Sequence, residues 1–192
     1  MVSKRSVFRT PVQEIRLERI PGNDPILDIG GGCEGLVSRI EGSRVCAVDL
    51  NPNEILEAQI HAPESQWVLA DGRYLCIKDA SFETVTAWFM LGYVSNWEDK
   101  ERLLRQAHRT MKKDGLLSIM ASNITTTENR HIMETVFEFP DGEVSKTGYG
   151  VAGKQDQTLD TVSLVLSRIG FDLVRAEGNR YWFRIEAKKR PA

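Results

Sequence analysis

Glycine clusters directly after a short apolar stretch, and this pattern can hold a ligand against the backbone. Ile26–Ile29 is followed by Gly30, Gly31 and Gly32, and then by Gly35. Gly30 and Gly32 lack a Cβ atom and can adopt positive φ angles, so a ligand can lie beside the main chain. A helix that begins after these glycines offers free N–H groups to an anionic or carboxylate group. The spacing of Gly30, Gly32 and Gly35 matches GxGxxG, which also fits nicotinamide and flavin dinucleotide sites.

Three aspartates end successive apolar stretches, and together they describe the ligand more closely. Asp28 lies two residues before the first glycine, where a carboxylate is unfavourable beside a phosphate but suits an ammonium group. Asp49 can accept hydrogen bonds from both ribose hydroxyls, and Asp71 can accept one from an adenine amino group. Parallel strands share their carboxyl edge, so the three carboxylates should line one site. The pattern favours a ligand with an adenine, a ribose and a cationic amino acid tail, without phosphate.

At these residues the chain resembles the class I S-adenosylmethionine-dependent methyltransferases. ILDIGGGCEG is similar to their first motif, VCAVDLN to the ribose-binding segment, LADGRYLCIKDASFETVTAWF to the adenine segment, and LLRQAHRTMKKDGLLSIMAS to the later helix, turn and strand. The resemblance covers residues 25–121 well and extends more loosely to the end. It implies S-adenosyl-L-methionine as cofactor and S-adenosyl-L-homocysteine as product. The cofactor-binding residues it implies are Asp28, Gly30, Gly31, Gly32, Asp49, Leu50, Asp71, Gly72 and Trp88.

The sequence departs from the family pattern at a few positions. Glu34 stands where the family often has a third glycine, and Gly35 follows it. Glu83 replaces the usual aspartate, and Asp114 replaces a proline or glycine. Neither of the last two changes concerns the chemistry.

Short apolar stretches alternate with helical patterns over the first two thirds of the chain. Strands are predicted at 26–29, 45–48, 67–70, 84–89 and 116–121, with helices after the first two and at 99–111. Such alternation indicates βαβ units and a mostly parallel sheet. Residues 171–176 and 180–187 add two strands, and the clean alternation of the last one is typical of an antiparallel strand. The expected fold is therefore a single α/β, Rossmann-like domain (1–192) with a seven-stranded, mostly parallel sheet and an antiparallel closing strand.

The remaining segments flank the cofactor-binding core at 25–121. Residues 1–24 carry one helical pattern, with Val12, Ile15 and Arg19 on one side, and predict an N-terminal helical cap. Residues 158–192 should form a closing helix followed by the antiparallel strands. Between them, 122–157 contains a pattern typical of an inserted β-hairpin about Pro140-Asp141-Gly142 and a short helix expected at 128–134.

The segment 122–157 is longer than usual connections in α/β units, which suggests a cover over an acceptor site. The alternative is a hairpin that only extends the sheet or forms a dimer interface. The catalytic residues stay unknown, with Tyr93, His131 and Tyr149 as weak candidates on the acceptor side. Methyl transfer from a sulfonium requires positioning rather than a protein nucleophile, so the lack of a visible catalytic triad does not argue against an enzyme.

Composition narrows the function classes. The 192 residues carry 25 Lys+Arg and 27 Asp+Glu, a net charge of −2, which makes nucleic-acid binding unlikely. The three cysteines and three histidines lack metal-ligand spacing, so no metal is predicted. No stretch is long enough for a membrane span and no targeting segment is evident, so we expect a cytoplasmic protein. The oligomeric state is open, with a homodimer as one option.

The function predicted from these observations is methyl transfer to a small-molecule acceptor. One alternative is an NAD(P)-dependent Rossmann reductase, which Asp28 and the lack of a Tyr-xxx-Lys pair disfavour. The other is a non-catalytic domain that binds S-adenosylmethionine as a regulator, because binding residues do not demonstrate turnover.

Overall fold

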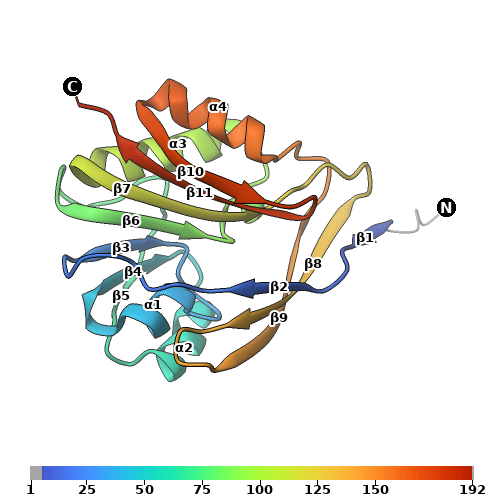
Figure 1. Ribbon diagram of the computed structural model, residues 1–192, viewed down its shortest axis with the longest axis horizontal. Coiled ribbons are helices and arrows are strands. Elements are labelled where there is room, and N and C mark those ends of the chain that lie inside the picture. Colours follow the sequence, from blue (N-terminus) through green and yellow to red (C-terminus); the bar gives the residue numbers. More distant parts are fainter. Residues whose placement is uncertain (1–5, 192) are drawn as a thin grey trace.

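A seven-stranded sheet forms the centre of the computed structural model, which describes residues 6–191 (Figure 1). The strand order is β10-β11-β7-β6-β3-β4-β5. Its members are β3 (Ile26–Ile29), β4 (Val45–Asp49), β5 (Gln66–Leu69), β6 (Phe82–Trp88), β7 (Met111–Ser122), β10 (Phe171–Gly178) and β11 (Trp182–Lys189). β11 runs antiparallel to both of its neighbours, and the five strands from β3 to β7 are parallel. The predicted α/β sheet with an antiparallel closing strand is confirmed.

Helices cover both faces of this sheet. α3 (Trp97–Thr110) and α4 (Leu159–Ile169) pack together on one face, where Leu104 and Leu166 are fully buried. α1 (Leu36–Glu41) packs on β4 and β6, and α2 (Pro52–His61) packs beside β4 and β5. Two short 3-10 helices, η1 (Gly42–Arg44) and η2 (Leu91–Tyr93), complete these connections.

A second, smaller sheet flanks the carboxyl edge of the large one (Figure 1). It contains β1 (Val7–Arg9), β2 (Gln13–Arg16), β8 (Arg130–Glu138) and β9 (Val144–Ala152). β8 is central, since it pairs in parallel with β1 and β2 and antiparallel with β9. Its buried side chains share a core with α1, which places this sheet on the face opposite α3 and α4.

The predicted N-terminal helical cap is wrong. The described part of that segment, from residue 6, forms β1 and β2 instead, and residues 1–5 lie outside the described residues. Gln13, Ile15 and Leu17 are buried with exposed residues between them, which is the period of a strand. The helical spacing of Val12 and Ile15 is coincidental, because β8 supplies the hydrogen bonds that make this segment extended.

The short helix predicted at 128–134 is also wrong. These residues lead into β8, in which His131, Met133, Thr135 and Phe137 are buried and the residues between them are more exposed. Strands on both sides satisfy the backbone of β8, so the extended form is favoured over a single helical turn. The predicted helix at 99–111 begins two residues earlier than expected, and Met111 already belongs to β7.

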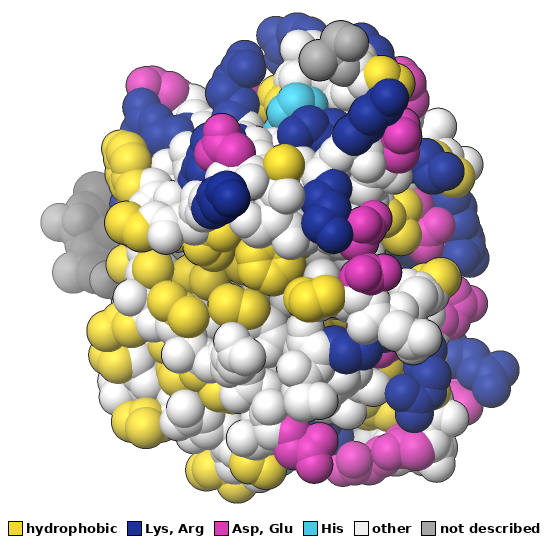
Figure 2. Space-filling model, turned by 90° about the vertical axis from the view of Figure 1, so that its left-hand side faces the viewer, with side chains coloured by type: hydrophobic (Ala, Val, Ile, Leu, Met, Phe, Trp, Pro, Cys, Tyr) yellow, Lys and Arg dark blue, Asp and Glu magenta, His cyan; other side chains and the backbone are white. Residues whose placement is uncertain are grey.

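The basic residues of α3 are neutralised at the surface rather than gathered into an anion site. Arg102 pairs with Glu98 and Arg105 with Glu101, each one turn apart on the exposed helix face. Figure 2 views the edge at which the parallel strands begin, and basic side chains there lie mainly on the half that carries α3 and α4.

Within residues 6–191, no helix has the length and apolar character needed to cross a bilayer.

Candidate functional site

A cavity of about 460 Å³ lies at the carboxyl edge of the parallel strands. The segments that follow β3, β4, β5 and β6 line it, and Tyr149 of β9 closes one side. All nine residues predicted to bind a cofactor line this cavity, namely Asp28, Gly30, Gly31, Gly32, Asp49, Leu50, Asp71, Gly72 and Trp88. Residues from four separate strand ends therefore meet in one space, as the parallel topology requires.

The glycine loop brings carboxylates close to the main chain. Gly30 has a φ of 75°, and its N–H donates to the carbonyl oxygen of Val48 at 2.7 Å, which joins the loop to β4. A Cβ atom on Gly32 would lie 2.7 Å from the side chain of Glu54 and 2.8 Å from the Asp49 carboxylate. Glycine is therefore required at position 32 because two acidic side chains approach the backbone there.

Asp28 is a buried carboxyl group at the base of the cavity. Its side chain is 2% exposed, and its Oδ1 atom accepts a hydrogen bond of 2.6 Å from the Thr86 hydroxyl. Burial raises the pKa of Asp28 from 3.8 to about 7, against the lowering effect of Thr86 and with a further rise from the charge of Asp49. A cation bound in the cavity would favour the ionised form of this group.

Asp49 is oriented by backbone hydrogen bonds. Its Oδ2 atom accepts from the N–H of Gly32 at 3.1 Å, and its Oδ1 atom accepts from the N–H of Asn51 at 2.8 Å. The cap of α2 is supplied by Asn51, whose Oδ1 atom accepts from the N–H of Asn53. Asp49 is thus free of the capping role and faces the cavity with a fixed side-chain orientation.

Asp71 is held by an arginine that sequence reasoning missed. The Arg73 guanidinium donates to both carboxylate oxygens of Asp71, at 2.9 Å and 2.6 Å, and bridges to Asp99 of α3 at 2.8 Å. These contacts lower the pKa of Asp71. The Asp71-x-Arg73 spacing was the one available clue, since Asp99 becomes a partner only through the fold. Leu75, further along the same connection, belongs to the core and does not line the cavity.

Aromatic side chains form the wall on the β9 side. Phe89 stacks on Tyr149 with ring centroids 4.8 Å apart, and its φ of 57° is unusual for a bulky residue. Tyr93 also lines the cavity and is exposed at the surface. Burial raises the pKa of Tyr149, so its hydroxyl stays protonated at neutral pH. Trp88 is fixed by a hydrogen bond of 3.0 Å from its indole N–H to Ser118.

His131, the third acceptor-side candidate, does not join this group. It lies on β8 beside a separate cavity of about 250 Å³, with its ring stacked on Phe8 at 5.4 Å. Its side chain is 1% exposed, and neither ring nitrogen has a hydrogen-bond partner among the described residues. Burial lowers the pKa of His131, which favours the neutral ring.

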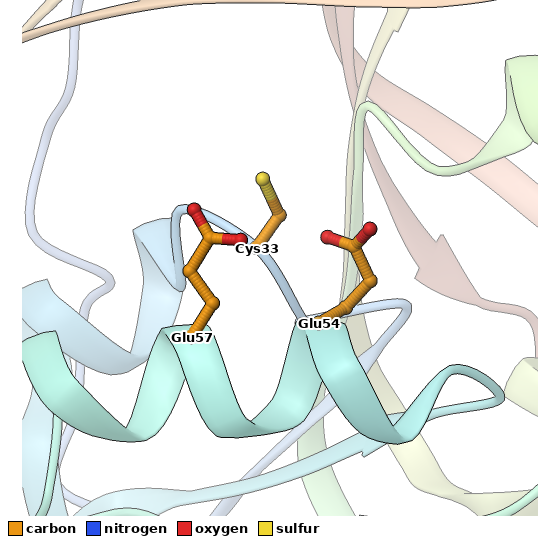
Figure 3. A group of neighbouring side chains, drawn as sticks. All are labelled: Cys33, Glu54 and Glu57. Carbon is orange, nitrogen blue, oxygen red and sulfur yellow. The ribbon is translucent and has the colours of Figure 1, made fainter.

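Cys33, Glu54 and Glu57 converge at the edge of the cavity, as Figure 3 shows. Their ligand atoms lie within 4.8 Å of one another, the two glutamates coming from α2 and the cysteine from the glycine loop. Burial and the charge of Glu54 raise the pKa of the Cys33 thiol to about 12. The thiol is therefore protonated at neutral pH, whereas a metal ligand would have to be the thiolate.

The chain is similar to methyltransferases in sequence. Residues 27–119 match a family described as a methyltransferase domain. A mitochondrial 2-methoxy-6-polyprenyl-1,4-benzoquinol methylase of Leishmania donovani is 27% identical over 124 residues, which cover 53% of this chain. The match covers only 42% of that protein, so the chain spans less than half the length of this curated relative.

Solved structures share the fold. An S-adenosylmethionine-dependent methyltransferase of Methanosarcina mazei has a TM-score of 0.67 at 19% identity, with 90% of this chain and 95% of that chain covered. The N-methyltransferase NodS of Bradyrhizobium japonicum, crystallised with S-adenosyl-L-homocysteine, has a TM-score of 0.61 at 15% identity, covering 86% and 78% of the two chains. At these identities the similarity establishes the fold.

Proposed function

We propose that the chain is a class I S-adenosylmethionine-dependent methyltransferase, an enzyme that transfers a methyl group to a small-molecule acceptor. The observation that carries this proposal is the convergence of three carboxylates, from the ends of β3, β4 and β5, in one glycine-lined cavity. The cytoplasm stays our prediction for its location, and the curated relative is named as a mitochondrial protein.

Each cavity residue has a proposed role toward the cofactor. Asp28 would bind the ammonium group of the methionine tail, with a backbone carbonyl of Trp88 or Phe89 beside it, and Gly30–Gly32 would leave room for the tail. Asp49 would accept from the ribose hydroxyls, for which its hydrogen bonds to Gly32 and Asn51 already orient it. Asp71 and Gly72 would border the adenine together with Leu50. Because Arg73 occupies both oxygens of Asp71, adenine recognition there requires the carboxylate to accept one more hydrogen bond.

The cofactor supplies an activated methyl group, and the chain supplies position and a dry environment. Orientation of reacting groups can contribute about 7–11 kcal/mol in the best intramolecular cases. The stacked rings of Phe89 and Tyr149 and the glycine loop line the same cavity, in which we place the acceptor.

We also assign the cover of this space to residues 122–157, which include β8 and β9. Ser145 donates a hydrogen bond of 2.7 Å to Glu34 of the glycine loop. Arg39 of α1 contacts Glu34 at 3.3 Å and Glu143 at 2.9 Å, and its guanidinium lies 3.8 Å from the Phe139 ring centroid. These contacts join the cofactor loop to the β8–β9 connection and support a cover rather than a sheet extension. Ser145 and Arg39 both contact the carboxylate of Glu34, the glycine-loop residue at which the sequence departs from the family pattern.

Calorimetry and a turnover assay test the proposal. S-adenosyl-L-homocysteine should bind, whereas NAD(H) and NADP(H) should not. Incubation with methyl-labelled S-adenosylmethionine and a library of small molecules should transfer label to an acceptor, which mass spectrometry detects. Binding of the nicotinamide cofactors without a response to S-adenosyl-L-homocysteine would contradict the assignment, and binding without any turnover would favour the regulatory, non-catalytic alternative.

A further inference from the structure

The acceptor side of the cavity is lined by aromatic side chains, of which Phe89 and Tyr149 stack on each other. Phe89, Tyr93 and Tyr149 lie on this side, away from the Arg73 end, which belongs to the α3 face of the sheet. Tyr149 is 9% exposed, lines the cavity, and its hydroxyl has no hydrogen-bond partner among residues 6–191. A buried hydroxyl without a partner in a cavity is available to a ligand.

The same side carries negative charge. Glu34 and Glu54 line the cavity beside the aromatic residues, and the Cys33 thiol between them is neutral. Among the described residues, the Glu54 side chain accepts one hydrogen bond, a long one of 3.5 Å from the Asn51 amide to its Oε1 atom. Glu34 keeps one oxygen for other contacts, because Ser145 and Arg39 both bind its Oε2 atom.

Of the two carboxylates, Glu34 pairs with Arg39, and Glu54 has no cationic partner among the described residues of the cavity. Arg73 is the one basic residue among those that line it, and Asp71 and Asp99 hold its guanidinium. Arg39 lies outside the wall and is shared by Glu34 and Glu143. Arg130 of β8 affects Tyr93 electrostatically but is not a lining residue. An anionic acceptor would therefore meet the Glu54 carboxylate without a compensating charge.

We infer that the methyl acceptor is an amine with an apolar body, bound as its ammonium form between the aromatic faces and the carboxylates of Glu34 and Glu54. This inference rests on the proposed function. Aromatic faces attract ammonium groups, and nearby carboxylates strengthen that attraction. The Tyr149 hydroxyl is placed to accept one N–H of the ligand.

The charge balance of the reaction fits such a site. The ammonium first gives one proton to Glu54, which leaves a lone pair on nitrogen. That lone pair forms the bond to the methyl carbon while the carbon–sulfur bond breaks and its electron pair stays on sulfur. The positive charge thus passes from sulfur to nitrogen inside the same pocket. Glu54 keeps the proton that the ammonium released, so Glu34 is the carboxylate left to stabilise the product ammonium.

Three probes that share a phenyl ring and differ in charge test the inference by calorimetry on the complex with S-adenosyl-L-homocysteine. They are benzyltrimethylammonium, benzyl alcohol and benzoate, which are cationic, neutral and anionic. We expect the cation to bind at least 10-fold more tightly than benzoate and more tightly than the alcohol. Equal or tighter binding of benzoate or the alcohol would overturn the inference while leaving the proposed function intact. If S-adenosyl-L-homocysteine itself does not bind, the proposed function fails and the inference fails with it.

Variants connect the preference to the named residues. Glu54→Gln and Glu34→Gln should each weaken binding of benzyltrimethylammonium about 3- to 10-fold. Titration of S-adenosyl-L-homocysteine into the same variants measures any effect on the cofactor site separately. Tyr149→Phe keeps the ring face and should retain this binding, whereas Tyr149→Leu should lose most of it. Glu98→Gln, on the exposed face of α3, is the matched control and should have no effect.

Turnover of benzylamine provides a second measurement. With methyl-labelled S-adenosylmethionine, the enzyme should methylate benzylamine to N-methylbenzylamine. This reaction should be faster than methylation of benzyl alcohol to its methyl ether or of benzoate to its methyl ester. Unchanged probe affinity in Glu54→Gln, Glu34→Gln and Tyr149→Leu would show that the acceptor binds elsewhere, as would faster methylation of the alcohol or acid.

Discussion

The ammonium nitrogen of Lys100 lies 2.7 Å from the Oε1 atom of Gln155, and this contact joins α3 to the chain that follows β9. Lys100 is fully buried and also donates to Gln157 at 2.6 Å. The two glutamines extend this hydrogen-bond network, because the Gln155 amide donates to the carbonyl oxygen of Gly92 and the Gln157 amide donates to the carbonyl oxygen of Ser122. One buried lysine therefore fixes three segments at the edge of the sheet that carries the cavity.

Replacing this lysine should destabilise the protein. Lys100→Met leaves the amide oxygens of Gln155 and Gln157 buried without a donor, which costs about 2 kcal/mol. For a chain of this size we expect the melting temperature to fall by roughly 4–8 °C, measured by calorimetry. Lys113→Met, at an exposed position, is the control and should change it little.

The cost of the substitution should depend on pH. Burial lowers the pKa of Lys100 from 10.5 to about 8, so between these values the unfolded chain binds more protons than the native one. Wild-type stability gains on the order of 1–2 kcal/mol from this group between pH 7 and pH 9.5, and Lys100→Met lacks that gain. Chemical denaturation at both pH values measures the difference. A stability difference that stays constant over this range would show that Lys100 titrates normally.

Asp28 should make cofactor binding depend on pH near neutrality. Its pKa of about 7 means that the carboxyl group is largely protonated at pH 6 and largely ionised at pH 8. If the ionised form binds the ammonium of S-adenosyl-L-homocysteine, affinity should rise about 10-fold from pH 6 to pH 8. Calorimetry at both values measures this, and Asp28→Asn should bind weakly with a flat profile. The same pH dependence in Asp28→Asn would assign it to another group.

Asp49 should contribute to affinity rather than to stability. Asp49→Ala leaves the two ribose hydroxyls without an acceptor, and we expect roughly 5- to 100-fold weaker binding of S-adenosyl-L-homocysteine with little change in melting temperature. Asn51→Ala removes the cap of α2 and should lower stability by about 1 kcal/mol while leaving most of the affinity. Titration calorimetry and thermal melts on both variants separate the two roles. Unchanged affinity in Asp49→Ala would contradict the ribose assignment.

Arg39 should hold the β8–β9 connection against the cofactor loop. Arg39→Met leaves the half-buried Glu34 without its cation and frees Glu143, so amide exchange at 143–148 should become up to roughly 10-fold faster. Arg16→Met removes an exposed pair with Glu138 at 3.7 Å and should have no such effect. Hydrogen-exchange mass spectrometry compares the two. An equal response in both variants would argue against the cover. Deleting residues 135–149 would test the cover less clearly than these substitutions. It would also remove Phe137, Phe139 and Tyr149 from the core and so destabilise the fold.

The central sheet could be predicted because its evidence is local. Ile26–Ile29, Val45–Val48 and their neighbours are short apolar runs that alternate with helices, and the topology then places Asp28, Asp49 and Asp71 at one edge. The predicted strand ends agree with the structure to within two residues, except that β7 begins at Met111 rather than at residue 116.

The pairing of β1 and β2 with β8 and the polar clusters could not be predicted, because the partners are distant in sequence. The extended form of Gln13–Arg16 depends on β8, and the orientation of Asp71 depends on Asp99. Phe89 has a positive φ and stacks on Tyr149, and a phenylalanine in the sequence does not indicate such a backbone conformation. Likewise, nothing local in the sequence indicates that His131 is buried away from the cavity.

The pairing of β2 with β8 also has a consequence for the order of folding. Gln13 lies opposite Thr135, and Val7 lies opposite Arg130, so each pair closes a loop of more than 120 residues. Such distant contacts form late, because the entropy of closing the loop must be overcome first. During synthesis the N-terminal strands leave the ribosome long before their partner exists. The parallel core should therefore assemble first, with Ile15 and Leu17 exposed until β8 arrives, and that interval is when the nascent chain is most prone to aggregate.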